Sequence, residues 1–492
     1  MKPTLAASAL LAGFLAGRSL GWPLIHDAPL FHYVAWLLGQ GLVPYRDIFD
    51  MNLPGVYLLH WALLATAGGG DLAWRLFDLG WLAATAILLY VFCRPLGGVV
   101  GAAGASLLFV LYHLAGGAWH VVQRDFLLCF FLAAGACGIA RAWDRGGSRL
   151  ALLWGGAALG AGLTVKPYAA GIFWLGSAAA GAAAARRAGR AALPGAVAVL
   201  GAGLAAPALV FGWIAWRGGL GAFRDTLVGY VIPFYSRLGQ EPLWTALGGH
   251  AHGWTLLALL GALALWGLLV PMAPAFGIRR RLAALGVVAG ALHFALQGKG
   301  WEYHLYPLAF FLCALAAPAG EAVVAAGAPR ARELAHAAAI VLFAATAMVL
   351  GAKGVEAMDA RWIDAKARRV AAIARDLGPL VPAGDTVQVL DVTEGGIHAL
   401  LRLELRQPTR FLYDFHFFHN ETNPRIQALR AELVRGLERR RPAAVVVLRD
   451  SWLERGYDRL ARFPELSDLL ARDYALAVQG DDYRIYAKRS GS

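Results

Sequence analysis

Long runs of apolar residues, separated by short polar stretches, recur between residues 4 and 352. At about 1.5 Å of rise per residue, a helix of about 20 residues crosses the ~30 Å apolar core of a bilayer. The pattern therefore predicts a polytopic α-helical membrane protein with about eleven transmembrane helices, at 4–24, 76–93, 99–116, 126–141, 150–165, 168–185, 193–216, 254–272, 282–297, 303–319 and 335–352. A further run, 53–67, is short and contains Pro54, which predicts a re-entrant or interfacial helix.

Beyond residue 352 the pattern changes to frequent charges and mixed periodicity. Segments 385–391, 410–413 and 443–448 predict strands, and 424–440 predicts a basic amphipathic helix. Two short runs, 474–478 and 483–487, flank a Gly-Asp-Asp turn and predict a terminal hairpin. We therefore expect two domains, a membrane domain at 1–352 and a small soluble α/β domain at 353–492.

Composition supports the membrane assignment, and the charge pattern orients the chain. Apolar residues make up 59% of the 492 residues and charged residues only 16%, with a mean hydropathy of +0.54, which excludes a water-soluble protein. The net charge of +13 comes from short arginine clusters between spans rather than from a nucleic-acid-binding patch. With eleven spans, the positive-inside rule places these clusters and Lys2 in the cytoplasm and 353–492 outside. The opposite orientation stays open at this stage.

A polar stretch at 25–52 follows the first apolar run and carries the first candidate site. A carboxylate at a membrane boundary is costly unless it is used, so Asp27 is a catalytic candidate that could accept a proton from a hydroxyl group or hold a divalent cation. The alternative is a helix N-cap, because a proline and an apolar helix follow. Asp47 and Asp50 are further acidic candidates beside Arg46. A local Arg46–Asp50 ion pair or a turn cap is the alternative there.

Two loops on the same expected side carry candidate phosphate ligands. Arg124 and Asp125 precede the span 126–141, where they would bind phosphate and supply a second acid, or would only anchor the helix end. Lys166 lies between two spans, where it is a candidate phosphate ligand or a lysine that extends to the membrane interface.

The strongest candidate after Asp27 is the loop GKGWEYHLYP, which starts at Gly298. Lys299 lies between two glycines that let the backbone approach a ligand closely, and Tyr303 and His304 add donors suited to a phosphate or a sugar. An aromatic belt with snorkelling charges is the alternative.

At these residues the chain resembles the bacterial branch of the membrane glycosyltransferases of the GT-C superfamily, the family 39-like relatives of protein O-mannosyltransferases and lipid A aminoarabinose transferases. In that superfamily the first outer loop opens with an acidic residue and closes with Pro-rich sequence before a membrane helix. The matching stretches cover most of the membrane part: His26-Asp27, GLVPYRDIFDMNLPGVYLLH at 41–60, Trp74-Arg75-Leu76, QRDFLL from Gln123 and GKGWEYHLYP from Gly298.

The resemblance implies a glycosyltransferase that moves a sugar from a polyprenyl-phosphate donor to an envelope lipid, glycan or protein, with inversion, on the non-cytoplasmic face. It also implies that Asp27 is the general base. Many relatives have Asp-Glu at this point, whereas Ala28 follows Asp27 here, so Asp47, Asp50 or Asp125 would have to replace the second acid. We expect no required metal, because the leaving group is already a phosphate monoester, although a divalent cation is compatible with the site. The abundance of Ala, Gly and Arg indicates a GC-rich bacterial genome, and together with the apolar runs we expect a multi-pass protein of a bacterial plasma membrane.

Two other classes of function fit the pattern less well. A transporter or lipid flippase should show repeat symmetry and charges near the centres of its spans, whereas most acids here lie at span ends. A non-catalytic envelope-assembly protein would tolerate neutral replacement of Asp27 and Lys299. The aromatic run FLYDFHFFH at 411–419 offers either a sugar-stacking surface or a buried strand.

Overall fold

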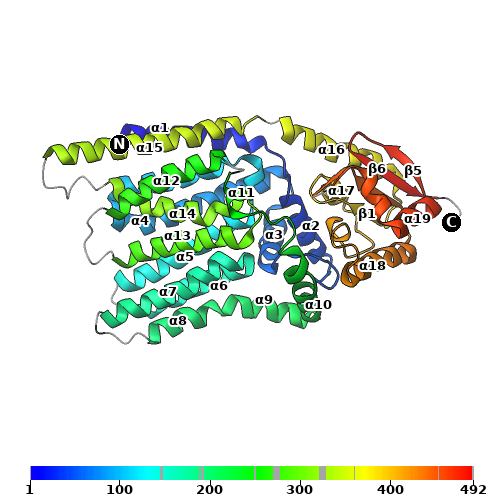
Figure 1. Ribbon diagram of the computed structural model, residues 1–492, viewed down its shortest axis with the longest axis horizontal. Helices are drawn as coiled ribbons and strands as arrows, with labels where there is room; N and C mark the ends of the chain where they lie inside the picture. The colour runs from blue at the N-terminus through cyan, green and yellow to red at the C-terminus, as the bar shows by residue number, and fades with distance from the viewer. Residues whose placement is uncertain are drawn as a thin grey trace. The chain divides into compact units, whose positions relative to one another are not determined.

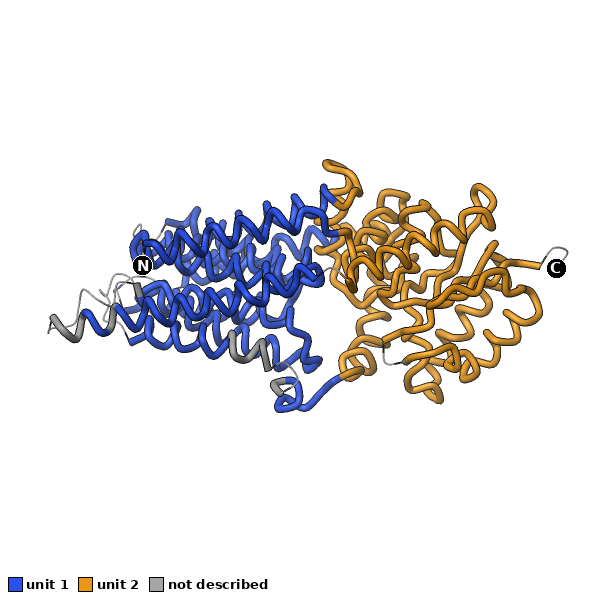
Figure 2. The backbone as a smooth tube through the Cα atoms, turned by 90° about the horizontal axis from the view of Figure 1, so that it is seen from above, with its two compact units in different colours: residues 1–22, 72–212, 240–359 blue, residues 23–71, 213–239, 360–492 orange. Residues whose placement is uncertain are grey.

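The structure is a computed structural model that describes residues 2–144, 148–187, 189, 193–248, 251–269, 277–320, 329–359, 361–452 and 454–489. By their contacts the residues form two compact units (Figure 2). Unit 1 comprises 1–22, 72–212 and 240–359, and unit 2 comprises 23–71, 213–239 and 360–492. Each unit is described by itself below.

Unit 1 is a bundle of apolar helices, which lie side by side in Figure 1. Their lengths follow from the apolar runs of the sequence, and each predicted run in this unit is helical over most of its described length. The helices are α1 (Lys2–Arg18), α4 (Asp71–Ala115), α5 (Arg124–Asp144), α6 (Arg149–Val165), α7 (Pro167–Arg187), α8 (Leu193–Gly203), α9 (Ala205–Trp216, which continues into unit 2), α11 (Leu243–Gly248), α12 (Ala251–Leu269), α13 (Gly277–Gln297), α14 (Tyr306–Ala316) and α15 (Pro329–Glu356).

Six helical stretches among the described residues are long and apolar enough to cross a membrane: Lys2–Gly21, Asp71–Ala115, Arg124–Trp143, Pro167–Arg187, Leu193–Trp216 and Ala337–Leu380. One of them, Asp71–Ala115, contains two predicted runs, because α4 is kinked by non-helical backbone at Gly97 and Gly98 just after Pro95. The end of the predicted run 254–272 lies outside the described residues. The count of eleven spans stays a prediction.

Small residues allow the bundle helices of unit 1 to approach closely. Gly156 and Gly160 are four residues apart on α6, and a Cβ on either would overlap the backbone of α8 at Val199 or Gly203. Such small-xxx-small spacing is a typical device for helix packing in lipid, where no hydrophobic effect drives helices together.

Unit 2 contains a four-stranded sheet with the order β1-β2-β6-β5, in which β1 pairs parallel with β2 and the other pairs are antiparallel. The strands are β1 (Val387–Leu390), β2 (Ala444–Leu448), β5 (Tyr474–Gln479) and β6 (Tyr483–Lys488), and a two-stranded ribbon joins β3 (Asp450–Ser451) to β4 (Glu454–Arg455). The helices around it are α16 (Arg361–Leu377), α17 (Gly396–Leu403), α18 (Pro424–Arg440) and α19 (Pro464–Asp473). The predicted strands near 385–391 and 443–448, the helix 424–440 and the terminal hairpin are all present.

The strand predicted at 410–413 is wrong. This segment makes only an isolated bridge between Phe49 and Phe411, and its backbone is otherwise irregular. Phe411, Leu412 and Tyr413 are all buried, so their apolar character reflects packing of a loop into the core of unit 2 rather than the alternating burial of a half-exposed strand.

Two segments from the first part of the chain belong to unit 2. They form α2 (Ala28–Gly39), α3 (Pro54–Ala67), α10 (Leu220–Thr226) and a π-helix (Leu227–Tyr235). The predicted short helix at 53–67 is α3. Tyr33 donates a hydrogen bond to the Leu405 carbonyl at 2.9 Å, and the Phe49 and Phe411 rings lie 5.4 Å apart. The proposed domain boundary at 352/353 stays a prediction, because these contacts join sequence-distant segments to 360–492.

Candidate functional site

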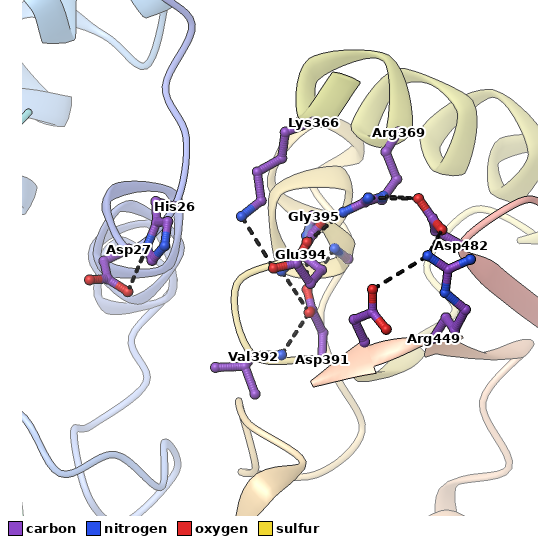
Figure 3. Close-up of polar contacts among 12 residues, drawn as sticks. His26, Asp27, Lys366, Arg369, Asp391, Val392, Glu394, Gly395, Arg449 and Asp482 are labelled. Atoms are coloured by element: carbon purple, nitrogen blue, oxygen red, sulfur yellow. Dashed lines mark hydrogen bonds and ion pairs between the residues drawn. The ribbon is translucent and has the colours of Figure 1, made fainter. Parts of the chain in front are cut away.

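Asp27 lies in unit 2 at the residue that precedes α2, as the N-cap alternative required. Its side chain makes no capping hydrogen bond, however. Instead, Oδ1 lies 3.4 Å from His26 Nδ1 (Figure 3), and His26 has a positive φ of 62°. A left-handed histidine is uncommon and marks a backbone held by its surroundings. Capping does not account for the carboxylate, which remains a candidate for chemistry.

The loop after β1 lies beside the Asp27 segment within unit 2. His26, Lys366 and Asp391 are among the residues that line a cavity of about 10 Å³, enough for roughly one water molecule. Asp391 is buried and accepts hydrogen bonds from the backbone N–H groups of Val392, Glu394, Gly395 and Gly396 (Figure 3). Burial raises the pKa of Asp391. The contacts fix this loop as one wall of the cavity beside His26.

Arg46 and Asp47 form a local ion pair in unit 2. Arg46 Nε and Nη2 donate to the two oxygens of Asp47 at 3.0 and 2.7 Å, so the pair is Arg46–Asp47 rather than the Arg46–Asp50 pair weighed from the sequence. Partial burial would raise the pKa of Asp47, but the hydrogen bonds from Arg46 and from the Val43 N–H lower it below its usual value. A carboxylate held in its charged form in this way is a weak base.

Asp50 is buried in a separate hydrogen-bond network of unit 2. It accepts the Met51 N–H at 2.6 Å, the Asn52 amide at 2.9 Å and the Tyr57 hydroxyl at 2.5 Å. These bonds shape the turn that leads into α3.

Unit 1 brings together the other six predicted site residues, and Asp125 is at their centre. Asp125 is fully buried in the first turn of α5. Lys166, at the turn between α6 and α7, lies 3.3 Å from Asp125 Oδ2. His293 Nε2 on α13 lies 2.5 Å from Oδ1, and the Gln297 side-chain amide lies 3.3 Å from the same oxygen and 2.8 Å from His293 Nε2. Helices α5 and α13 and the turn between α6 and α7 therefore contribute to one buried polar cluster.

The contacts of His293 determine its protonation state. The backbone N–H of Ala169 donates to His293 Nδ1 at 3.2 Å, so Nδ1 carries no proton and Nε2 is the donor to Asp125. A neutral His293 thus links the carboxylate on α5 to the first turn of α7. It holds Asp125 next to Lys166.

Lys299 brings a third cation into the cluster region. It is 8% exposed, and its ammonium group lies 5.4 Å from the centre of the Trp301 ring. The flanking Gly298 and Gly300 both have positive φ, 62° and 65°, a conformation that glycine adopts readily. Burial, together with the positive charges of Lys166 and Arg124, lowers the pKa of Lys299 from 10.5 to about 6. Lys166 and Arg124 therefore lie close enough to Lys299 for their charges to act on it.

Tyr303 and His304 complete this part of unit 1. Their rings lie 4.7 Å apart, and the His304 ring is 5.4 Å from Trp301 and 6.3 Å from His293. Both side chains are buried. The other four predicted site residues belong to unit 2: Asp27, Arg46, Asp47 and Asp50.

Sequence reasoning missed His293 and assigned no role to Gln297, which directly precedes the Gly-Lys-Gly loop. Both lie on the apolar helix α13 at i and i+4, so they share one face, and polar residues in a membrane helix are functional candidates by default. The two polar residues on an apolar helix were the signal, just before the Gly-Lys-Gly loop.

Among the described residues, no group of three or more His, Cys, Asp and Glu side chains is arranged to hold a metal ion.

The chain has the fold of solved structures of ArnT, a lipid A aminoarabinose transferase of the kind named in the predicted resemblance. It aligns with ArnT from Cupriavidus metallidurans bound to undecaprenyl phosphate at a TM-score of 0.61 and 12% identity, over 99% of this chain and 98% of that one. The apo ArnT structure gives 0.59 and 12%, over 98% and 97%. The apo oligosaccharyltransferase of Archaeoglobus fulgidus gives 0.50 and 12%, over 99% and 74%.

No known family model matches this sequence, and no curated protein matches it significantly. At 12% identity the structural likeness establishes the fold, a polytopic helical membrane protein with a small C-terminal sheet region.

Proposed function

We propose that this protein is a glycosyltransferase that takes its sugar from a polyprenyl-phosphate donor. The observation that carries the proposal is the neighbourhood of three cationic side chains in unit 1: Lys166 pairs with the buried Asp125, and the charges of Lys166 and Arg124 both act on Lys299. Cations placed in a poorly hydrated site bind a phosphate strongly and stabilise it as it departs. The fold supports this assignment, because the aligned ArnT was solved with undecaprenyl phosphate.

The proposed reaction is a single displacement at the anomeric carbon. An acceptor hydroxyl oxygen forms the new bond to that carbon, and the bond from the carbon to the phosphate oxygen breaks, which inverts the configuration. Asp27 takes the hydroxyl proton, and polyprenyl phosphate leaves with its charge balanced by the three cations. Asp27 suits the role of base better than Asp47 or Asp125, because Arg46 lowers the pKa of Asp47 and Asp125 is bound by Lys166 and His293.

The remaining candidates receive supporting roles in this proposal. Tyr303 and His304 would contact the sugar or the phosphate, and Arg46 and Asp50 would shape the Asp27-bearing segment. No metal is part of the proposed reaction. The acceptor is an envelope lipid, glycan or protein, reached on the outer face of a bacterial plasma membrane, with 353–492 on the same side.

The direct test supplies purified protein with a radiolabelled polyprenyl-phosphate sugar and an envelope extract, and follows label into acceptor. We expect transfer by the wild type. Arg124→Gln and Lys299→Met should each weaken donor affinity about 10- to 100-fold, since each removes a charge-assisted contact worth ~1.5–3 kcal/mol. Arg375→Gln, which changes an exposed arginine of α16, is the control and should bind donor normally. Transport of label without transfer would identify a flippase instead.

The low pKa of Lys299 predicts that donor binding takes up a proton. Free Lys299 is protonated below pH about 6, and a bound phosphate would raise that pKa. Donor affinity should therefore be greatest below pH 6 and decline by up to about tenfold per pH unit above it, until the pKa of the complex is reached. Calorimetry at pH 7.5 in buffers of different ionisation enthalpy should show uptake of nearly one proton, absent in Lys299→Met. Equal uptake by the variant and the wild type would assign the proton to another group.

A further inference from the structure

A second buried polar network in unit 1 lies outside the residues assigned above. Its centre is Asp78 on α4, which is fully buried and forms an ion pair with Arg75. The Arg75 guanidinium also donates to Ser19 Oγ from Nε at 3.0 Å and from Nη2 at 2.6 Å. The ion pair is thus satisfied on both sides within the bundle.

Asp78 also holds the loop that carries Arg124. Its Oδ1 accepts the backbone N–H of Val122 at 2.7 Å, and Val122 has a φ of 56°. A β-branched residue rarely adopts this left-handed conformation, so the fold must over-determine it. The bond fixes the backbone two residues before Arg124.

The network continues from Asp78 to the loop that carries Lys299. His113 Nε2 lies 2.9 Å from Asp78 Oδ2, and His113 Nδ1 lies 2.8 Å from the Tyr306 hydroxyl. That hydroxyl is also 3.1 Å from His120 Nδ1. Tyr306 starts α14, directly after the loop 298–305, whereas His120 lies in the loop before Arg124.

The hydrogen bonds in this network have a consistent direction. His113 donates from Nε2 to the Asp78 carboxylate, and the Tyr306 hydroxyl donates to His113 Nδ1. The Tyr306 oxygen then accepts the Nδ1–H of His120. Burial lowers the pKa of His120 to about 4, so it is neutral at physiological pH. A Cβ at position 116 would overlap the His120 ring, so only glycine at this position leaves room for the ring.

We infer that Tyr306 is a positioning residue that ties the loops 117–125 and 298–306 together and thereby sets Arg124 and Lys299 for one phosphate. The functional part of this inference rests on the proposed donor. Each loop alone could hold its cation in many places, whereas a shared hydroxyl bonded to both His113 and His120 fixes their relative position.

The test compares Tyr306→Phe with Tyr112→Phe. The two rings lie 5.3 Å apart and both are buried, but among the described residues the Tyr112 hydroxyl has no hydrogen-bond partner. Tyr306→Phe should weaken binding of undecaprenyl phosphate about tenfold, short of the ~100-fold that a 1 Å misplacement can cost. Tyr112→Phe should bind like the wild type, and similar losses in both variants would overturn the inference.

A double-mutant cycle separates positioning from general destabilisation. If Tyr306 acts through Lys299, the fold loss of affinity in the double variant Tyr306→Phe/Lys299→Met should be smaller than the product of the two single losses. A double loss equal to that product would contradict the inference.

Hydrogen exchange of the protein without ligand gives a second readout. Amides in both loops should exchange faster in Tyr306→Phe only, and a change confined to one loop would refute the coupling. Wild type that fails to bind undecaprenyl phosphate would count against the proposed function, while hydrogen exchange would still decide the coupling.

Discussion

Asp27→Asn is expected to reduce sugar transfer at least ~100-fold while the protein stays folded and binds its donor. Proton removal by a positioned carboxylate contributes about 10²- to 10⁴-fold to such reactions, and an amide cannot accept the proton. Asparagine keeps the size of the side chain and serves equally well before a helix. Because the Asp27 side chain makes no capping bond to α2, its replacement should leave the free energy of unfolding within about 0.5 kcal/mol of the wild type.

Three measurements on one purified preparation decide this prediction: turnover, affinity for undecaprenyl phosphate and the melting temperature. Asp458→Asn, at an exposed acid of unit 2, is the matched control and should change none of them. Near-normal turnover of Asp27→Asn would remove the residue from the mechanism. A large fall in melting temperature would make Asp27 a structural residue.

The helices could be predicted from the sequence because lipid imposes one simple rule, that a spanning backbone must satisfy its own hydrogen bonds. That rule says nothing about which helices meet, so the sequence offered Asp125, Lys166 and Lys299 as three separate loop candidates. His293 bonds to Asp125 and to the first turn of α7, and its role depends on a contact between α5 and α13 that no local pattern encodes.

The errors in the predicted local structure have a common cause. The segment 410–413 resembles a strand in sequence, but a buried loop has the same apolar residues when a core surrounds it. Arg46 pairs with its immediate neighbour Asp47 rather than with Asp50, because a turn brings the adjacent side chains together while Tyr57 and Asn52 engage Asp50. Both cases depend on tertiary contacts that override spacing along the chain.

The sequence also could not predict which earlier segments pack with 360–492, namely 23–71 and 213–239. Phe49 and Tyr230 lie in the same hydrophobic core as Phe417 and Val445, although the chain separates them by many spans. Composition changes near residue 353, and that change marks where the chain leaves its last apolar run. It does not mark which earlier loops pack with the sheet.

Asp125→Asn should lower the free energy of unfolding by about 3–5 kcal/mol, the usual cost of removing one partner from a buried ion pair. Asp125 is fully buried and Lys166 is 7% exposed, so the variant leaves a cation in a site that offers little water. Below pH about 6, where Lys299 is protonated, its like charge raises the cost further. The measurement is chemical or thermal unfolding of the purified variant in detergent.

The double variant Asp125→Asn/Lys166→Met separates this structural role from function. Replacing both members of a buried pair removes the uncompensated charge, and such replacements are often neutral or stabilising by about 1–4 kcal/mol. The double variant should therefore recover most of the lost stability and still bind undecaprenyl phosphate at least about tenfold more weakly than the wild type, because one of the three proposed phosphate ligands is gone. Recovery of both stability and affinity would show that Lys166 only balances the charge of Asp125 and does not bind the phosphate. Recovery of neither would show that His293 needs a charged carboxylate to hold α5 against α7 and α13.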